Sequence, residues 1–204
     1  STNFSVLRVK RDILRKSSIG AQVTHRSLAQ AGVGTNDAYG VDGSFAFFDN
    51  IYVNSYWART RSDGGSGRDV SYRAQFDYAA DRYGVQLERL VVGSRFNPDI
   101  GFVRRTDMGK TSGQFRFSPR MANSKTVRKL TWTGSVGYIH NGTGRLDTRD
   151  VDGLFSIDFE NSDRFSAGYH GTYEFLPQPF RIAPGVVLPV GGYDYHDARA
   201  SFTF

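Results

Sequence analysis

The chain has 204 residues, a net charge of +6 and no cysteine. This length suits a single domain, and the lack of cysteine excludes disulfide scaffolds and thiolate metal sites. Apolar residues make up 39% and aromatic residues 14% of the chain, a balance typical of strands that have one apolar face. No run of about 18 apolar residues occurs, so no transmembrane helix is expected.

Apolar and polar residues alternate along nearly every segment. In the stretch 70–79, Val70, Tyr72 and Phe76 have one parity, whereas Arg73 and Asp77 have the other. Because successive side chains of a strand point to opposite faces, this pattern predicts strands with one apolar and one polar face. In chain order, the predicted strands are about 3–12, 17–26, 39–48, 51–58, 70–79, 83–88, 112–118, 128–139, 150–160, 165–173 and 198–204.

The predicted connections alternate in length. Those after the first, third, fifth and ninth strands are short, and the one after the seventh is intermediate. The long connections are 27–38, 60–69, 93–111, 140–149 and 176–192. An up-and-down antiparallel sheet places alternate connections at opposite ends, and outer-membrane barrels have short turns at one end and long loops at the other. Strands of about ten residues, tilted near 45°, also match an apolar band of about 25 Å.

These patterns predict an all-β fold, an antiparallel up-and-down transmembrane β-barrel in the cell outer membrane, with 1–204 as a single barrel domain or segment. The polar parity is expected to line a wet lumen, where charged side chains pair with one another or bind and pass polar solutes. A catalytic pair of carboxylates is a further alternative. The lumen-facing candidates are Asp42, Arg73, Asp77, Glu88, Arg116, Lys129, Asp158, Arg164, His170 and Glu174.

The connection after the sixth strand contains a stretch, 96–105, that mixes apolar and charged residues. Its proline and glycine favour turns, but a solvated loop tip would not need two phenylalanines and an isoleucine. We therefore expect this loop to fold into the mouth of the barrel or to pack over it. Its candidate residues are Phe96, Asn97, Asp99, Phe102, Arg104 and Arg105.

Other chemistries find little support. The four histidines lack the spacing of metal ligands, and no G-x-S-x-G motif occurs, so no metal, cofactor or catalytic residue is assigned. His140 beside Asp147 and Asp150 could imitate a hydrolase site at the rim, although a polar outer loop is the simpler interpretation. The basic cluster between Arg8 and Lys16 is interpreted as a solvated turn or as a contact with anionic headgroups, and no nucleic-acid partner is expected.

Five strings, 4–12, 17–21, 42–45, 56–60 and 96–105, resemble a domain family of unassigned function. In that family the domain follows a carbohydrate-binding module similar to family nine, in large exported proteins of Gram-negative bacteria. The resemblance implies an outer-membrane β-barrel longer than this chain. The odd count of about eleven strands agrees, because single-chain bacterial barrels usually have an even number, and we expect Phe204 to lie at a cut within a strand.

The function expected from these features is a non-enzymatic outer-membrane barrel segment with a polar lumen, which supports glycan binding or uptake together with the upstream module. Its expected partners are outer-membrane lipid and a glycan ligand, and its oligomeric state is left open. Two alternatives remain open. One is a soluble secreted β-sandwich that binds carbohydrate, with its aromatic residues as the core. The other is a barrel-borne hydrolase that uses His170 with Glu174, or His140 with Asp150.

Overall fold

The computed structural model describes residues 2–28, 34–62 and 67–204, which form strands, turns and loops without any helix. The main sheet contains β1 (Phe4–Ile13), β2 (Ser17–Arg26), β3 (Asn36–Phe47), β4 (Ile51–Ser62), β5 (Val70–Ala79), β6 (Tyr83–Val92), β7 (Met108–Phe117), β8 (Val127–Asn141), β9 (Leu146–Phe159), β10 (Arg164–Leu176) and β13 (Gly191–Thr203). A separate hairpin pairs β11 (Phe180–Ala183) with β12 (Val186–Leu188). Within the described ranges, no helix has the length and apolarity needed to cross a membrane.

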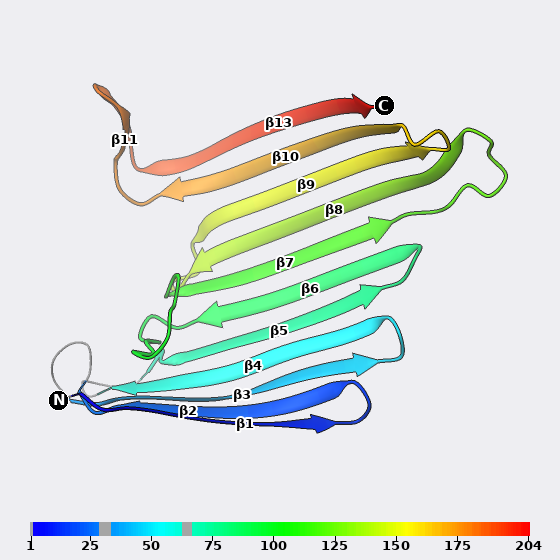
Figure 1. Cartoon of the computed structure of the whole chain (residues 1–204). Helices are drawn as coiled ribbons and strands as arrows, with labels where there is room; N and C mark the ends of the chain where they lie inside the picture. The colour runs from blue at the N-terminus through cyan, green and yellow to red at the C-terminus, as the bar shows by residue number, and fades with distance from the viewer. Residues whose placement is uncertain (1, 29–33, 63–66) are drawn as a thin grey trace. The chain divides into compact units, whose positions relative to one another are not determined.

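The main sheet has 11 strands in the order β1-β2-β3-β4-β5-β6-β7-β8-β9-β10-β13 (Figure 1). Each strand runs antiparallel to the next, so the predicted all-β, up-and-down antiparallel fold with about eleven strands is confirmed. Among the described residues, β1 pairs only with β2 and β13 only with β10. The sheet therefore has two edges and is not closed into a barrel.

The chain divides into two compact units, each with its own contacts. Unit 1 comprises Ser1–Asp77 and Glu88–Lys110, and unit 2 comprises Tyr78–Leu87 and Thr111–Phe204. In unit 1, Asp42 of β3 lies opposite Gly20 of β2 and Tyr56 of β4. In unit 2, His170 of β10 lies opposite Asp152 of β9 and Asp197 of β13. Because side chains alternate along each strand, these registers fix which residues share a face.

The connections follow the predicted alternation of lengths except at one hairpin. Residues 14–16, 48–50, 80–82 and 160–163 form short turns, and 93–107 and 177–190 form long connections. The long connection predicted at 140–149 is a turn of 142–145, because Asn141 Oδ1 accepts hydrogen bonds from the backbone N–H groups of Thr143 and Arg145 at 3.1 and 2.9 Å. The predicted loops 27–38 and 60–69 include residues outside the described part of the chain.

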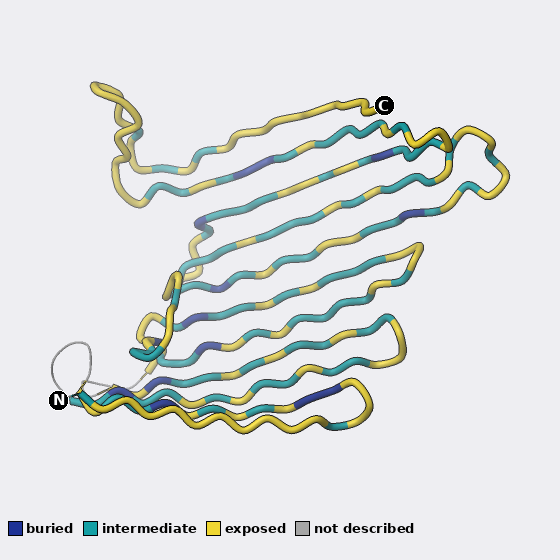
Figure 2. The backbone as a smooth tube through the Cα atoms, in the orientation of Figure 1, coloured by how far each residue is buried: buried dark blue, intermediate teal, exposed yellow. Residues whose placement is uncertain are grey.

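Very little of the described chain is a buried apolar core. Only two apolar residues are buried, Val92 and Phe96, and both belong to β6 and the loop that follows it. One face of the strands carries the apolar parity, and large apolar side chains on that face are exposed. Among them are Val9, Val23, Val41, Trp57, Tyr72, Leu87, Phe115, Trp132, Val151, Tyr169 and Phe202. Figure 2 shows teal and yellow along most strands and few buried positions. No second layer of described chain therefore covers the apolar face.

Aromatic rings form a continuous row on the apolar face of unit 2. Tyr83 and Phe117 have ring centroids 5.2 Å apart, Phe117 and Trp132 are 5.6 Å apart, and Trp132 and Phe155 are 5.2 Å apart. Arg82, in the turn between β5 and β6, lies over the first two rings at 5.6 and 5.3 Å. The row thus joins β6, β7, β8 and β9 next to a turn that carries a cation.

Candidate functional site

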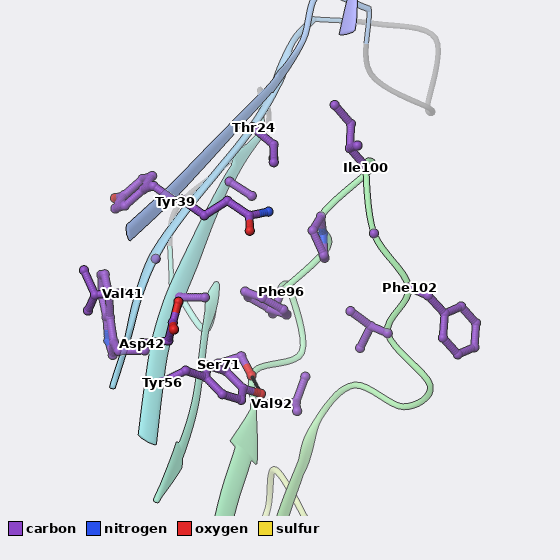
Figure 3. Close-up of a pocket in the computed structure, with 18 of the residues that line it drawn as sticks. Thr24, Tyr39, Val41, Asp42, Tyr56, Ser71, Val92, Phe96, Ile100 and Phe102 are labelled. Carbon is purple, nitrogen blue, oxygen red and sulfur yellow. Dashed lines mark hydrogen bonds between the residues drawn. The ribbon is translucent and has the colours of Figure 1, made fainter. Parts of the chain in front are cut away.

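The candidate site is built on the polar face of unit 1, which we define as the face that carries Thr24, Asp42, Tyr56 and Ser71 (Figure 3). Its centre is made of small residues. Gly40 of β3 lies opposite Ala58 of β4, and a Cβ on Gly40 would stand only 2.7 Å from the backbone oxygen of Trp57. The strands therefore leave a shallow floor here, on which another part of the chain can pack.

The loop 93–107 between β6 and β7 folds back over this floor. Its first residues continue the backbone pairing, because Gly93 N–H donates to Val70 O and Arg95 N–H to Arg68 O, both at 2.9 Å. Phe96 then turns towards the strands and is only 8% exposed. Phe102, in contrast, points away from the strands (Figure 3) and is 88% exposed. Phe96 is thus the apolar contact that seats the loop.

Two buried polar side chains of the strands fix the path of the loop. Asn36 of β3 donates from Nδ2 to Asn97 O at 2.9 Å, and its Oδ1 accepts from Asp99 N–H at 3.0 Å. Thr60 of β4 accepts from Asn97 N–H at 3.1 Å. Asn36 is 1% exposed, so losing these partners would leave backbone groups unsatisfied in a dry environment.

A buried carboxylate adds a charged contact to the same loop. The side chain of Asp99 is 2% exposed, and its Oδ2 lies 3.8 Å from Arg26 Nη1. The guanidinium of Arg26 also lies over the ring of Phe4, 5.2 Å from its centroid. Because an isolated buried charge is costly, the arginine from β2 and the carboxylate from the loop depend on one another.

Between the loop and the strands lies a cavity of about 580 Å³. Phe96, Ile100 and Val103 line it from the loop, and the loop candidates Arg104 and Arg105 are also among its lining residues. From the strands, Leu90 and Tyr56 complete the wall. The cavity is therefore mainly apolar and aromatic, with two arginines on the loop and a polar side on the strands.

That polar side is a compact network around the candidate Asp42. Arg8 donates to both carboxylate oxygens of Asp42, at 2.9 and 3.1 Å, and to Gln22 Oε1 at 3.0 Å. Ser71 donates to Val91 O at 3.1 Å, so the Tyr56 hydroxyl, 3.0 Å from Ser71 Oγ, is the donor of their shared hydrogen bond. The charges of Arg8 and Asp42 offset one another, which leaves a neutral polar wall beside an aromatic ring.

The other unit 1 candidates form a second ionic group on the polar face. Arg73 Nε donates to Glu88 Oε2 at 2.9 Å, and Lys110 Nζ lies 3.2 Å from Glu88 Oε1. Asp77 accepts a hydrogen bond of 2.6 Å from Gln75 Nε2. The structure thus brings Arg73 and Glu88 together as a cross-strand pair and adds Lys110, a cation that the strand pattern alone did not single out.

In unit 2, most of the charged candidates also have partners. Arg116 Nη1 donates to Asp81 O at 2.9 Å. Arg164 Nε lies 2.8 Å from Asp158 Oδ1, and Lys129 is opposite Asp158 in the register of β8 and β9. Charges on this face are therefore arranged as cross-strand neighbours, a spacing at which opposite charges stabilise a sheet.

The candidate His170 lies in a chain of hydrogen bonds. Its Nδ1 is 2.7 Å from Asp152 Oδ1 and its Nε2 is 2.8 Å from Thr172 Oγ1, whereas the candidate Glu174 lies opposite Thr148. The Thr172 hydroxyl donates to Asp150 Oδ1 at 3.0 Å. Since the hydroxyl has one proton, His170 must donate to Thr172, which is the opposite of what activates a nucleophile. With the Thr172 proton directed to Asp150, His170 does not accept it as a catalytic base would.

The rim candidates His140, Asp147 and Asp150 each have a separate contact. His140 stacks on Tyr138, with ring centroids 6.4 Å apart. Asp147 pairs with Arg145 at 3.0 Å, and Asp150 accepts from Thr172. These contacts give both carboxylates partners of their own. Across residues 2–28, 34–62 and 67–204, no cluster of three or more His, Cys, Asp or Glu side chains is placed to hold a metal ion.

Several residues of the site were not singled out by the sequence patterns. Asn36 and Thr60 lie within stretches that the alternation predicts as long connections, although both continue the polar parity of β3 and β4. Arg26 was predicted only as the last residue of a strand. Arg8 was predicted as part of a basic cluster in a solvated turn or at lipid headgroups, whereas it lies inside β1 and pairs with Asp42. Comparison with family models, with curated proteins and with solved structures gave no match, so the functional argument rests on this geometry.

Proposed function

We propose that the chain forms a wall segment of a non-enzymatic outer-membrane β-barrel, whose polar inner face and inward loop support the binding or uptake of glycans. One observation carries the proposal. The strands have an apolar face that no described part of the chain covers, whereas a long loop folds onto their polar face and forms one wall of an open cavity. A barrel places lipid against the first face and water or solute against the second.

Lipid is the cover that best fits the apolar face. Large exposed apolar patches on soluble proteins are rare and mark interaction surfaces, and burying such surface gains roughly 25 cal/mol per Å². The exposed apolar residues recur on strands from both units, so a cover must follow the strands along their length. Rows of aromatic rings, such as Tyr83, Phe117, Trp132 and Phe155, resemble the aromatic girdles at the borders of membrane barrels.

The polar face suits a wet lumen. The contacts of Glu88 with Arg73 and Lys110, and of Asp158 with Arg164, leave the cationic side chains 38% to 58% exposed. The cations reach water, and the carboxylates of Glu88 and Asp158, 14% and 15% exposed, balance their charge from below, so the lining contains both signs of charge. This lining favours neutral or zwitterionic polar solutes over ions of one sign.

The cavity under the loop favours a sugar as the bound solute. Sugar rings present apolar C–H surfaces and hydroxyl groups together, and binding pockets match such ligands with aromatic walls and a few oriented polar groups. Tyr56 and Phe96 supply aromatic surface. Arg8, Gln22 and Asp42 supply donors and acceptors without net charge.

The first test asks whether the protein needs a membrane environment. We expect it to fold into detergent micelles or lipid vesicles, with its strands protected from protease, and to aggregate when detergent is removed. A monomer that stays folded and soluble without detergent would contradict the barrel and favour a soluble carbohydrate-binding β-sandwich.

The second test asks whether the cavity binds glycans. Neutral oligosaccharides of different linkage are titrated calorimetrically into the micelle-bound protein and into Tyr56→Ala. Tyr52→Ala is the matched control, because Tyr52 lies on the same face of β4 and hydrogen-bonds Asp49 O at 3.2 Å, away from the cavity. We expect binding that Tyr56→Ala weakens and Tyr52→Ala leaves unchanged. If Tyr56→Ala and Tyr52→Ala bind oligosaccharides equally well, the cavity is rejected as a glycan site. The same holds if the unchanged protein binds none of them.

A further inference from the structure

The apolar face of unit 1 carries a groove that the proposed function does not use. The register of β1 to β4 places its residues in two adjacent rows. One row is Arg11, Ile19, Gly43 and Ser55, and the next is Val9, Ala21, Val41 and Trp57. The first row is thus small at Gly43 and Ser55, whereas its neighbours are larger. A hollow in the sheet surface follows from this contrast in side-chain size.

The walls of the hollow come from two aromatic side chains. The ring of Phe45 leans over Gly43, where an added Cβ would lie 2.6 Å from it. Trp57 stands on the other side and stacks in a tilted fashion with Tyr39, with ring centroids 6.1 Å apart. The open groove has a volume of about 610 Å³, and its lining is largely apolar. This shape and chemistry suit a hydrocarbon chain.

One end of the groove is cationic. Arg11 lines the groove from β1, two residues before that strand ends at Ile13. The turn that follows carries Arg15 and Lys16, and Lys16 Nζ lies 3.6 Å from Asp49 Oδ1 of the neighbouring turn. A basic side chain at the strand end of a lipid-facing groove lies where a phosphate group would be expected in a membrane.

We propose that this groove binds one anionic glycerophospholipid, with an acyl chain against Ala21, Ser55 and Trp57 and the phosphate on Arg11. The inference rests on the proposed membrane location, because only then does the groove face lipid. Charge complementarity identifies the occupant. An apolar groove alone would accept any acyl chain, whereas the arginine at its end selects a headgroup with net negative charge.

The test uses the two tryptophans of the chain as separate probes. Trp57 lines the groove and Trp132 lies on the apolar face of unit 2, and both are 40% exposed. Trp132→Phe leaves Trp57 as the only tryptophan, and Trp57→Phe leaves Trp132; excitation at the red edge of the absorption band selects tryptophan over tyrosine. Each protein is placed in phosphatidylcholine vesicles that contain a minor fraction of either brominated phosphatidylglycerol or brominated phosphatidylcholine, whose acyl chains quench nearby tryptophan.

We expect brominated phosphatidylglycerol to quench Trp57 at about one fifth of the concentration needed with brominated phosphatidylcholine, the enrichment expected for one basic residue beside a membrane surface. For Trp132 we expect a smaller difference between the two brominated lipids. Arg11→Gln should abolish the preference at Trp57, and Ala21→Leu should reduce quenching by both lipids because it fills the groove. Arg82→Gln is the matched control, since Arg82 belongs to unit 2, and should leave Trp57 unchanged.

The outcomes separate this site from the barrel proposal. If both lipids quench both tryptophans equally, the apolar face contacts lipid but the specific site is rejected. If brominated phosphatidylglycerol still quenches Trp57 preferentially in Arg11→Gln, the phosphate does not bind Arg11. If neither tryptophan is quenched by either lipid, the membrane location itself is wrong.

Discussion

Replacing Asn36 by alanine should release the loop 93–107 from the strands. The side chain makes three hydrogen bonds, to Ser62 Oγ at 2.8 Å, to Asn97 O at 2.9 Å and from Asp99 N–H at 3.0 Å. The last two hold the loop, and each is worth about 1 kcal/mol, or about 2 kcal/mol where a buried group is left unsatisfied. Their loss amounts to about 2–4 kcal/mol, which lowers the equilibrium constant for docking of the loop by about 30- to 1,000-fold.

Amide hydrogen exchange measures this change directly, because Asp99 N–H is itself one of the bonded groups. In the micelle-bound Asn36→Ala variant we expect Asp99 to exchange faster by roughly the same factor, with the amides of β3 and β4 unaffected. Asn54→Ala is the matched control, since Asn54 accepts from Ser44 Oγ at 2.7 Å on the same face without touching the loop. If Asp99 exchanges at the native rate in Asn36→Ala, the side chain does not anchor the loop and the reasoning fails.

Two further predictions concern charged groups. Hydrogen bonding to Arg120 and its positive charge lower the pKa of Asp81; the contribution of this pair to stability is therefore present above the unfolded pKa and is lost as the pH falls through the folded one. A carbon-13 titration of the carboxyl should show the lowered midpoint, and Arg120→Gln should raise it. Glu88→Gln leaves Arg73 and Lys110 without their shared carboxylate and should cost about 1–2 kcal/mol. Urea unfolding from micelles measures that cost, and an unchanged midpoint would contradict the pairing.

The alternation of the sequence predicted strands well where it extends to both ends of an element. For β2 and β5 the bounds 17–26 and 70–79 agree with the structure, because a side-chain period of two identifies a strand with one face in each environment. The alternation gave wrong strand bounds where polar residues continue a strand, as at the start of β3 and around the turn 142–145. It also did not predict the hairpin of β11 and β12, whose exposed residues lie within an expected long connection.

The site was predictable only in part. The apolar residues of the loop indicated that it packs against something, and Phe96 does so, whereas Phe102 is exposed. The strand residues that receive the loop could not be predicted, because Asn36 and Asp99 are 63 residues apart and meet only through the path of the loop. The same holds for Lys110, whose contact with Glu88 depends on where β7 begins.

The two edges of the sheet have a consequence that follows from strand direction alone. In an up-and-down order of eleven strands, ten antiparallel steps separate the first strand from the last. A ladder that joined them directly would be parallel, whereas a single inserted strand would be antiparallel to both. Each edge presents unpaired N–H and C=O groups along its length. Closure of the sheet with antiparallel pairing throughout would therefore require an odd number of added strands.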